Sequence, residues 1–129
     1  AGAKNSLGYM YENGLGVLPD LTRAVVLYKE AAQAGDAGAQ CTLGYFYHVG
    51  EGVPQNSKYA SALYRRAADQ GDPDALYNLG NMFRNGDGVP QSDINAVEMY
   101  RRADLRGHAG AQCNLGFMYE HGRGVSRHY

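Results

Sequence analysis

The sequence predicts an all-α fold, an α-α superhelix (solenoid) of 36-residue helix-turn-helix repeats. The 18 glycines among the 129 residues recur at five positions of a 36-residue period, and periods of about 20–50 residues are typical of stacked repeats. Apolar side chains follow two helical patterns in each repeat, each bounded by residues that start or stop helices. We therefore expect one solenoid domain over residues 1–129, with repeats at 1–36, 37–72 and 73–108 and the first helix of a fourth at 109–129.

The first helix of each repeat, helix A, is clearest from about residue 37 to 49. Its apolar side chains recur at helical spacing in Ala39, Leu43, Phe46 and Tyr47. Gly44 and Gly80 stand in the middle of this helix, where glycine costs about 0.5–1 kcal/mol relative to alanine. We expect both to lie where another helix approaches closely, next to the small side chains Ala60 and Ala96 of the second helix.

The second helix, helix B, follows a glycine loop that reads Gly50-Glu51-Gly52-Val53-Pro54 in the second repeat. Capping residues mark its start in successive repeats: Asp20, Asn56 and Ser92. Glycines suited to the left-handed position mark its end: Gly35, Gly71 and Gly107. Asp36 and Asp72 then cap the next helix A, and His108 occupies the same position at the end of the third repeat. The predicted order is seven helices, A-B-A-B-A-B-A.

The overall charge and hydropathy argue against two classes of partner. The formal net charge is −1, whereas nucleic-acid binders normally carry a basic excess, so we expect no nucleic acid. No apolar run approaches the ~20 residues of a membrane span, so we expect no membrane insertion. The chain begins Ala-Gly-Ala-Lys-Asn, and we expect it to be a piece of a longer protein.

The motifs of the repeat resemble those of the Sel-1-like repeat, a relative of the tetratricopeptide repeat. They are Leu-Gly-Tyr-Phe-Tyr at 43–47, the loop Gly-x-Gly-Val, and Tyr-Arg-Arg-Ala-Ala at 64–68, followed by Gly71-Asp72. The resemblance covers essentially the whole chain. It implies an adaptor that holds a protein or peptide on a concave face lined by the A helices, which is the surface that stacked repeats create.

The related tetratricopeptide pattern implies which residues contact the partner. They lie on helix A off the core stripe: Tyr45, His48, Tyr77, Asn81, Arg84, Asn85, Phe117 and His121. The third repeat contributes four of them at i, i+4, i+7 and i+8 of one helix. The glycine position occupied by Gly2, Gly38 and Gly110 lies early in helix A, and we expect it to leave room for a partner's backbone. The alternative is an ordinary solvated face.

Cysteine and histidine chemistry is not expected. Cys41 and Cys113 are two repeats apart, about 20 Å at a helix step of roughly 8–10 Å, so we expect free, partly buried thiols in the chain; disulfides between chains are left open. The histidines show no metal-ligand spacing such as His-Glu-x-x-His. Cys113 and His121 are about 12 Å apart along one helix, too far for a nucleophile and its base.

The remaining motifs also have structural explanations. The Gly-x-Gly loops follow no strand, so they are unlike phosphate-binding loops, and we expect no cofactor. Ser-x-x-Lys and Lys-Thr-Gly motifs are absent. The doubled arginines at 65–66 and 101–102 are expected on a solvated convex face, with pairs such as Arg102 and Glu98.

These observations favour a non-enzymatic protein-interaction scaffold. The first alternative is a structural spacer or a segment that self-associates through its unpaired C-terminal helix. The second is a hydrolase, which would need a nucleophile and base in contact.

Overall fold

The computed structural model describes residues 21–125 and contains six α-helices and no strand within that range. They are α2 (Leu21–Gln33), α3 (Ala37–Val49), α4 (Ser57–Asp69), α5 (Pro73–Asn85), α6 (Asp93–Asp104) and α7 (Ala109–His121). Helices α3, α5 and α7 are A helices, and α2, α4 and α6 are B helices. The predicted first A helix and the capping residue Asp20 lie outside the described residues.

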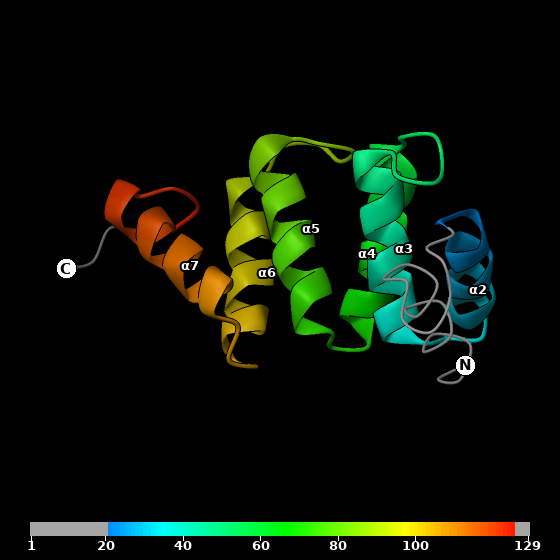
Figure 1. Cartoon of the computed structure of the whole chain (residues 1–129). Helices are drawn as coiled ribbons and strands as arrows, with labels where there is room; N and C mark the ends of the chain where they lie inside the picture. The colour runs from blue at the N-terminus through cyan, green and yellow to red at the C-terminus, as the bar shows by residue number, and fades with distance from the viewer. Residues whose placement is uncertain (1–20, 126–129) are drawn as a thin grey trace.

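The helices form two layers that extend along the molecule (Figure 1). Each helix packs chiefly against its neighbours in the chain, and α4 and α6 lie behind α3 and α5. The glycine loops after α3 and α5 lie on one long edge, and the turns after α4 and α6 lie on the opposite edge. The all-helical repeat architecture is therefore confirmed.

The predicted caps start the helices as expected. The Asn56 side chain accepts a hydrogen bond from the Tyr59 amide at 3.0 Å, and Ser92 accepts one from Asn95 at 3.1 Å. Asp36 and Asp72 do the same for α3 and α5. His108 caps α7 through Nδ1, which accepts from the Ala111 amide at 3.1 Å. These bonds satisfy amides that have no partner within the helix.

The turn between repeats depends on a left-handed glycine. Gly71 follows α4 with φ +87° and its amide donates to the Ala68 carbonyl at 2.8 Å. This closes the last turn of the helix and lets Asp72 begin the next helix directly. Gly35 and Gly107 have the same conformation at the two equivalent turns.

The mid-helix glycines lie under the tyrosine rings of the B helices. A Cβ atom at Gly44 would lie 2.9 Å from the Tyr64 ring, and one at Gly80 would lie 2.7 Å from the Tyr100 ring. Both tyrosines are fully buried. The expected close approach is confirmed, and the main neighbour is an aromatic ring rather than an alanine. Gly116 on α7 has no such neighbour within the described residues.

The glycine loops join successive repeats. A Cβ atom at Gly88 would collide with the Ser57 carbonyl at the start of α4, and Gly124 approaches the Asp93 carbonyl at the start of α6 in the same way. Arg123 reinforces the second contact with two hydrogen bonds to Asp93, at 2.9 and 3.1 Å. The loops therefore have a packing role in the stack.

No helix in the described range is both long enough and apolar enough to cross a bilayer.

Candidate interaction surface

Tyr77 lies between two A helices rather than on an open face. Its ring stacks on the His108 ring, with centroids 4.5 Å apart and planes 22° from parallel. A Cβ atom at Gly110 would lie 3.0 Å from the Tyr77 ring. The space at Gly110 is thus filled by Tyr77, not left for a partner's backbone as expected, because the A helices of successive repeats interlock there.

Asn81 also has intramolecular partners. Its Oδ1 accepts hydrogen bonds from the Tyr100 hydroxyl at 2.5 Å and from Asn114 Nδ2 at 3.0 Å. The side chain thereby connects α5 to α6 and α7. Its amide oxygen already accepts two hydrogen bonds from within the chain.

His48 forms a side-chain hydrogen bond across the repeat boundary. Its Nε2 lies 2.8 Å from Oδ2 of Asp87, in the loop of the next repeat. The Ser57 hydroxyl and His48 together hold the pKa of the Asp87 carboxyl below its usual value. Like Tyr77 and Asn81, His48 positions one repeat against the next.

The other five predicted site residues are accessible, and we call them the A-helix surface: Tyr45, Arg84, Asn85, Phe117 and His121. Tyr45 is 48% exposed and Phe117 is 44% exposed, although both are aromatic. Tyr45 and Phe117 occupy the same repeat position on α3 and α7. The His121 ring contacts Phe117, with centroids 4.3 Å apart.

Arg84 supplies a cation to this surface. It is half-buried on α5, between the helices that carry the two aromatic rings. Its guanidinium forms no ion pair with a carboxylate in the 21–125 range. The A-helix surface therefore combines exposed aromatic area with an uncompensated charge and the exposed amide of Asn85.

The two thiols differ in their surroundings. Burial, and then the negative charges of Asp72 and Asp74, raise the pKa of Cys41 to about 12. Cys113 is exposed, not partly buried as expected, because no further A helix covers it among the described residues. No hydrogen bond joins Cys113 to His121, and residues 21–125 contain no cluster of three potential metal ligands.

One predicted surface pair takes a different form. Arg102 does not pair with Glu98; its Nη2 donates to the Ala68 carbonyl at 3.3 Å, and the side chain is half-buried. Arg102 therefore does not lie on a fully solvated face as expected. Arg106, which no sequence motif singles out, lies near it at the turn after α6.

Comparison with known proteins gives a family and a set of similar structures. The model of the Sel1 repeat matches residues 1–36, 37–72, 73–108 and 109–127. A crystal structure of a protective antigen of uropathogenic Escherichia coli strains, described as displaying an SLR fold, is 38% identical with a TM-score of 0.95. A crystal structure of a Sel1 repeat protein from Oxalobacter formigenes is 36% identical with a TM-score of 0.92.

The present chain spans only part of those two proteins. Each match covers 98% of this chain, but 27% of the E. coli protein and 52% of the O. formigenes protein. Cysteine-rich protein B of Helicobacter pylori shares the fold at 21% identity and a TM-score of 0.76, over 88% of this chain and 87% of that one. The search of curated proteins found no match.

Proposed function

The chain belongs to the Sel1 repeat family, and from this premise we propose that it binds a segment of a partner protein through the A-helix surface. Sel1 repeat proteins are generally protein-interaction scaffolds and are typically non-enzymatic. The family establishes this general role. The surface and the kind of partner are our proposal.

The observation that supports the proposal most is the pair of exposed rings at one repeat position, Tyr45 and Phe117. Large aromatic side chains and arginine supply much of the binding energy of protein interfaces. On this chain the two rings lie on α3 and α7. The helix between them carries Arg84, whose guanidinium forms no ion pair with a described carboxylate. The contacts of His48, Tyr77 and Asn81 fix the positions of these helices.

Affinity capture with a matched control tests the proposal. We expect Tyr45→Ala/Arg84→Ala/Phe117→Ala to lose partners that the unmodified chain retains, with affinities lowered by about 30-fold or more. The control is Lys58→Ala/Ile94→Ala on the B helices, which removes one charge and one exposed apolar side chain (Ile94 is 72% exposed). Identical partners for all three proteins, each shown to be folded by circular dichroism, would contradict the proposal.

Self-association through α7 is a second candidate. Gly116 faces open space, the neighbouring Phe117 is 44% exposed, and Cys113 on the same helix is also exposed. Light scattering over a concentration series would then show that the mass of the unmodified chain rises with concentration. The mass of Phe117→Ser should be lower than that of the unmodified chain at the same concentration. A constant monomer mass would remove this candidate.

A further inference from the structure

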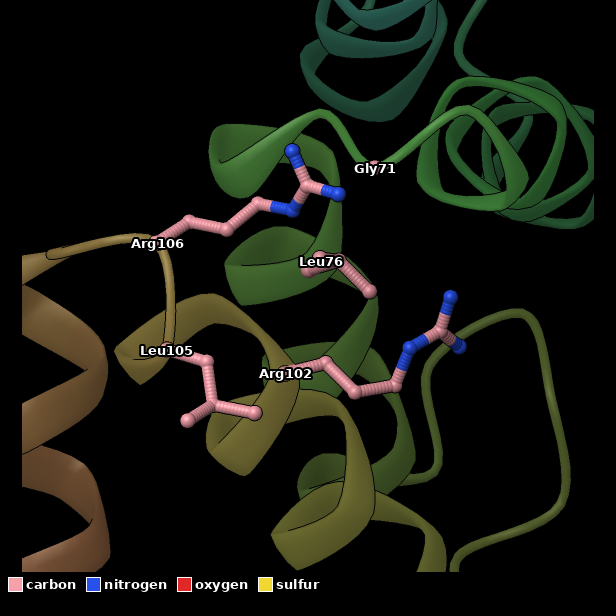
Figure 2. A pocket seen from close by; sticks show the side chains of 5 residues that line it. All are labelled: Gly71, Leu76, Arg102, Leu105 and Arg106. Atoms are coloured by element: carbon pink, nitrogen blue, oxygen red, sulfur yellow. The ribbon is translucent and has the colours of Figure 1, made fainter.

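A hollow of about 480 Å³ lies on the edge of the molecule formed by the turns between repeats. Its lining residues come from two successive turns and the helices beside them: Gly71, Leu76, Arg102, Leu105 and Arg106. Figure 2 shows Leu76 between the two arginine side chains, with Leu105 below Arg106. The hollow therefore has two cationic sides and an apolar wall.

Both guanidinium groups lie at the hollow, and neither has an acidic partner within residues 21–125. Arg106 extends over Gly71, where a Cβ atom would lie 2.5 Å from its Nη2, so glycine at this turn makes room for the guanidinium. Arg102 donates one hydrogen bond to the Ala68 carbonyl at 3.3 Å. Neither arginine forms an ion pair with a carboxylate of the described residues, although Asp69 lines a neighbouring hollow together with Arg102.

The preceding repeat fills the equivalent position with a hydrogen-bonded pair of glutamines. Gln70 Nε2 donates to Gln40 Oε1 at 3.0 Å, and Gln40 Nε2 donates to the Ala32 carbonyl at 3.1 Å. Gln40 is buried, at 2% exposure. In the preceding repeat, side-chain amides therefore occupy the position that is a hollow in the next repeat.

One repeat later, Leu76 replaces Gln40 and Arg106 replaces Gln70. Leucine cannot bond to the helix-end carbonyl, and Arg102 donates to that carbonyl, Ala68, instead. These two replacements remove the amide pair and bring a second cation to the position. Leu105, which aligns with Asp69 of the preceding repeat, lies beside it and is 87% exposed. Packing alone gives no reason for two guanidinium groups at this place that form no ion pair within the described residues.

We propose that this hollow, the Arg102–Arg106 site, binds a carboxylate of an acidic partner segment that carries an aliphatic side chain next to it. Arginine binds carboxylates through paired N–H donors, and such charge-assisted hydrogen bonds are among the strong ones. Leu105, which is 87% exposed, would contact the aliphatic side chain, and the buried Leu76 forms the floor of the hollow. The choice of a protein segment rests on the proposed function, whereas the oxyanion site itself rests only on the two arginines.

The probe is the capped peptide acetyl-Leu-Glu-Leu-Glu-amide, titrated into the isotope-labelled chain and followed by NMR. We expect saturable shifts of the Gly71 amide and of the Nε–H signals of Arg102 and Arg106. The counterpart with glutamine in place of glutamate should not bind. The Leu76→Gln/Arg106→Gln variant should raise the Kd about tenfold or more.

That double variant is chosen because it reproduces the glutamine pair that the preceding repeat already accommodates. Arg65→Gln is the matched control for charge and should change the Kd by less than about twofold. Tyr45→Ala/Arg84→Ala/Phe117→Ala should also leave peptide binding at this site unchanged. The experiment therefore distinguishes failure of the proposal for the A-helix surface from failure of the proposal for this site.

Three outcomes would overturn the proposal: equal binding of the glutamine peptide, an unchanged Kd in the folded double variant, or binding of inorganic phosphate without binding of the acidic peptide. The last result would assign the site to phosphate instead. Should the double variant not fold, Arg106→Gln alone provides the same comparison, because Arg106 is exposed.

Discussion

Two tyrosines at the same repeat position have different hydrogen bonding. Tyr100 donates to Asn81, whereas the buried Tyr64 hydroxyl finds no hydrogen-bond partner within the described part of the chain. The difference arises because the position of Asn81 is occupied by Tyr45 in the repeat before. Removing a paired buried hydroxyl loses a hydrogen bond, while removing an unpaired one relieves a desolvation cost.

We therefore expect Tyr100→Phe to lower the free energy of unfolding by about 1–2 kcal/mol and Tyr64→Phe to leave it unchanged or raise it. Urea denaturation of both variants measures the difference. Since the two substitutions remove the same atom from equally buried rings, each controls for the other. Equal losses would show that Tyr64 has a partner that the structure does not contain.

The Asp87 carboxyl makes the free energy of unfolding depend on pH in the acidic range. Its pKa in the folded chain is lowered by the Ser57 hydroxyl and by His48. A lowered folded pKa means that the carboxylate stabilises the fold above its ordinary pKa of about 3.9, and that this contribution is lost as the pH falls through the folded value.

Asp87→Asn should consequently be less stable than the unmodified chain at neutral pH, by at most about 1 kcal/mol because the pair is partly exposed to solvent. The difference should shrink as the pH falls from about 3.9 through the lower folded pKa of Asp87. Thermal melts across the acidic range measure it. Asp69→Asn removes the same charge at a carboxylate that forms no ion pair with another described residue. A similar pH profile for both variants would contradict the role given to Asp87.

Alanine substitutions at two mid-helix glycines distinguish the effect of packing on stability from the effect of helix propensity. A Cβ atom at Gly80 would press on the buried Tyr100 ring, which Asn81 holds in place, whereas Gly116 faces open space. We expect Gly80→Ala to destabilise by about 1–3 kcal/mol through overpacking. Gly116→Ala should stabilise by about 0.5–1 kcal/mol, because alanine favours the helix.

Chemical denaturation of the two glycine variants provides the measurement, and helix α7 serves as the control for α5. A stabilised Gly80→Ala would mean that Tyr100 can move away without cost. A destabilised Gly116→Ala would mean that something covers α7 in solution, such as a second copy of the chain.

The helices themselves could be predicted from sequence because their signals are local and recur in every repeat. Caps such as Asn56 and Ser92 and turn glycines such as Gly71 act within a few residues of the backbone they terminate. Repetition then confirms each signal independently. A solenoid follows from stacking, without knowledge of any long-range contact.

The surface could be predicted only in part, because its residues depend on contacts across repeats. Tyr77 and Asn81 lie on the expected side of α5, yet α7 and its cap engage them through His108 and Asn114. Helical periodicity carries no information about such contacts. The Arg102–Arg106 site did leave a signal, since Leu76 and Arg106 depart from Gln40 and Gln70 in the aligned repeats.

At the scale of the whole molecule, stability depends on neighbouring repeats. Helix α5 packs against α4 and α6, while α7 packs chiefly against α6 among the described helices. The buried side of α5 consists of Ala75, Leu76, Leu79, Gly80, Met82 and Phe83, and that of α7 of Ala111, Leu115 and Met118. In a stack of this kind, an element with fewer neighbours opens more readily.

We expect the backbone amides of α7 to exchange with solvent about tenfold faster than those of α5, or more, because opening α7 exposes less apolar surface. Hydrogen–deuterium exchange by NMR measures both helices in one sample. Repeating it over a range of protein concentrations distinguishes an intrinsic property of the stack from association. Exchange in α7 that slows with concentration, and no longer does so in Phe117→Ser, would identify self-association through this helix. Equal exchange in α5 and α7 at every concentration would contradict the nearest-neighbour description of the molecule.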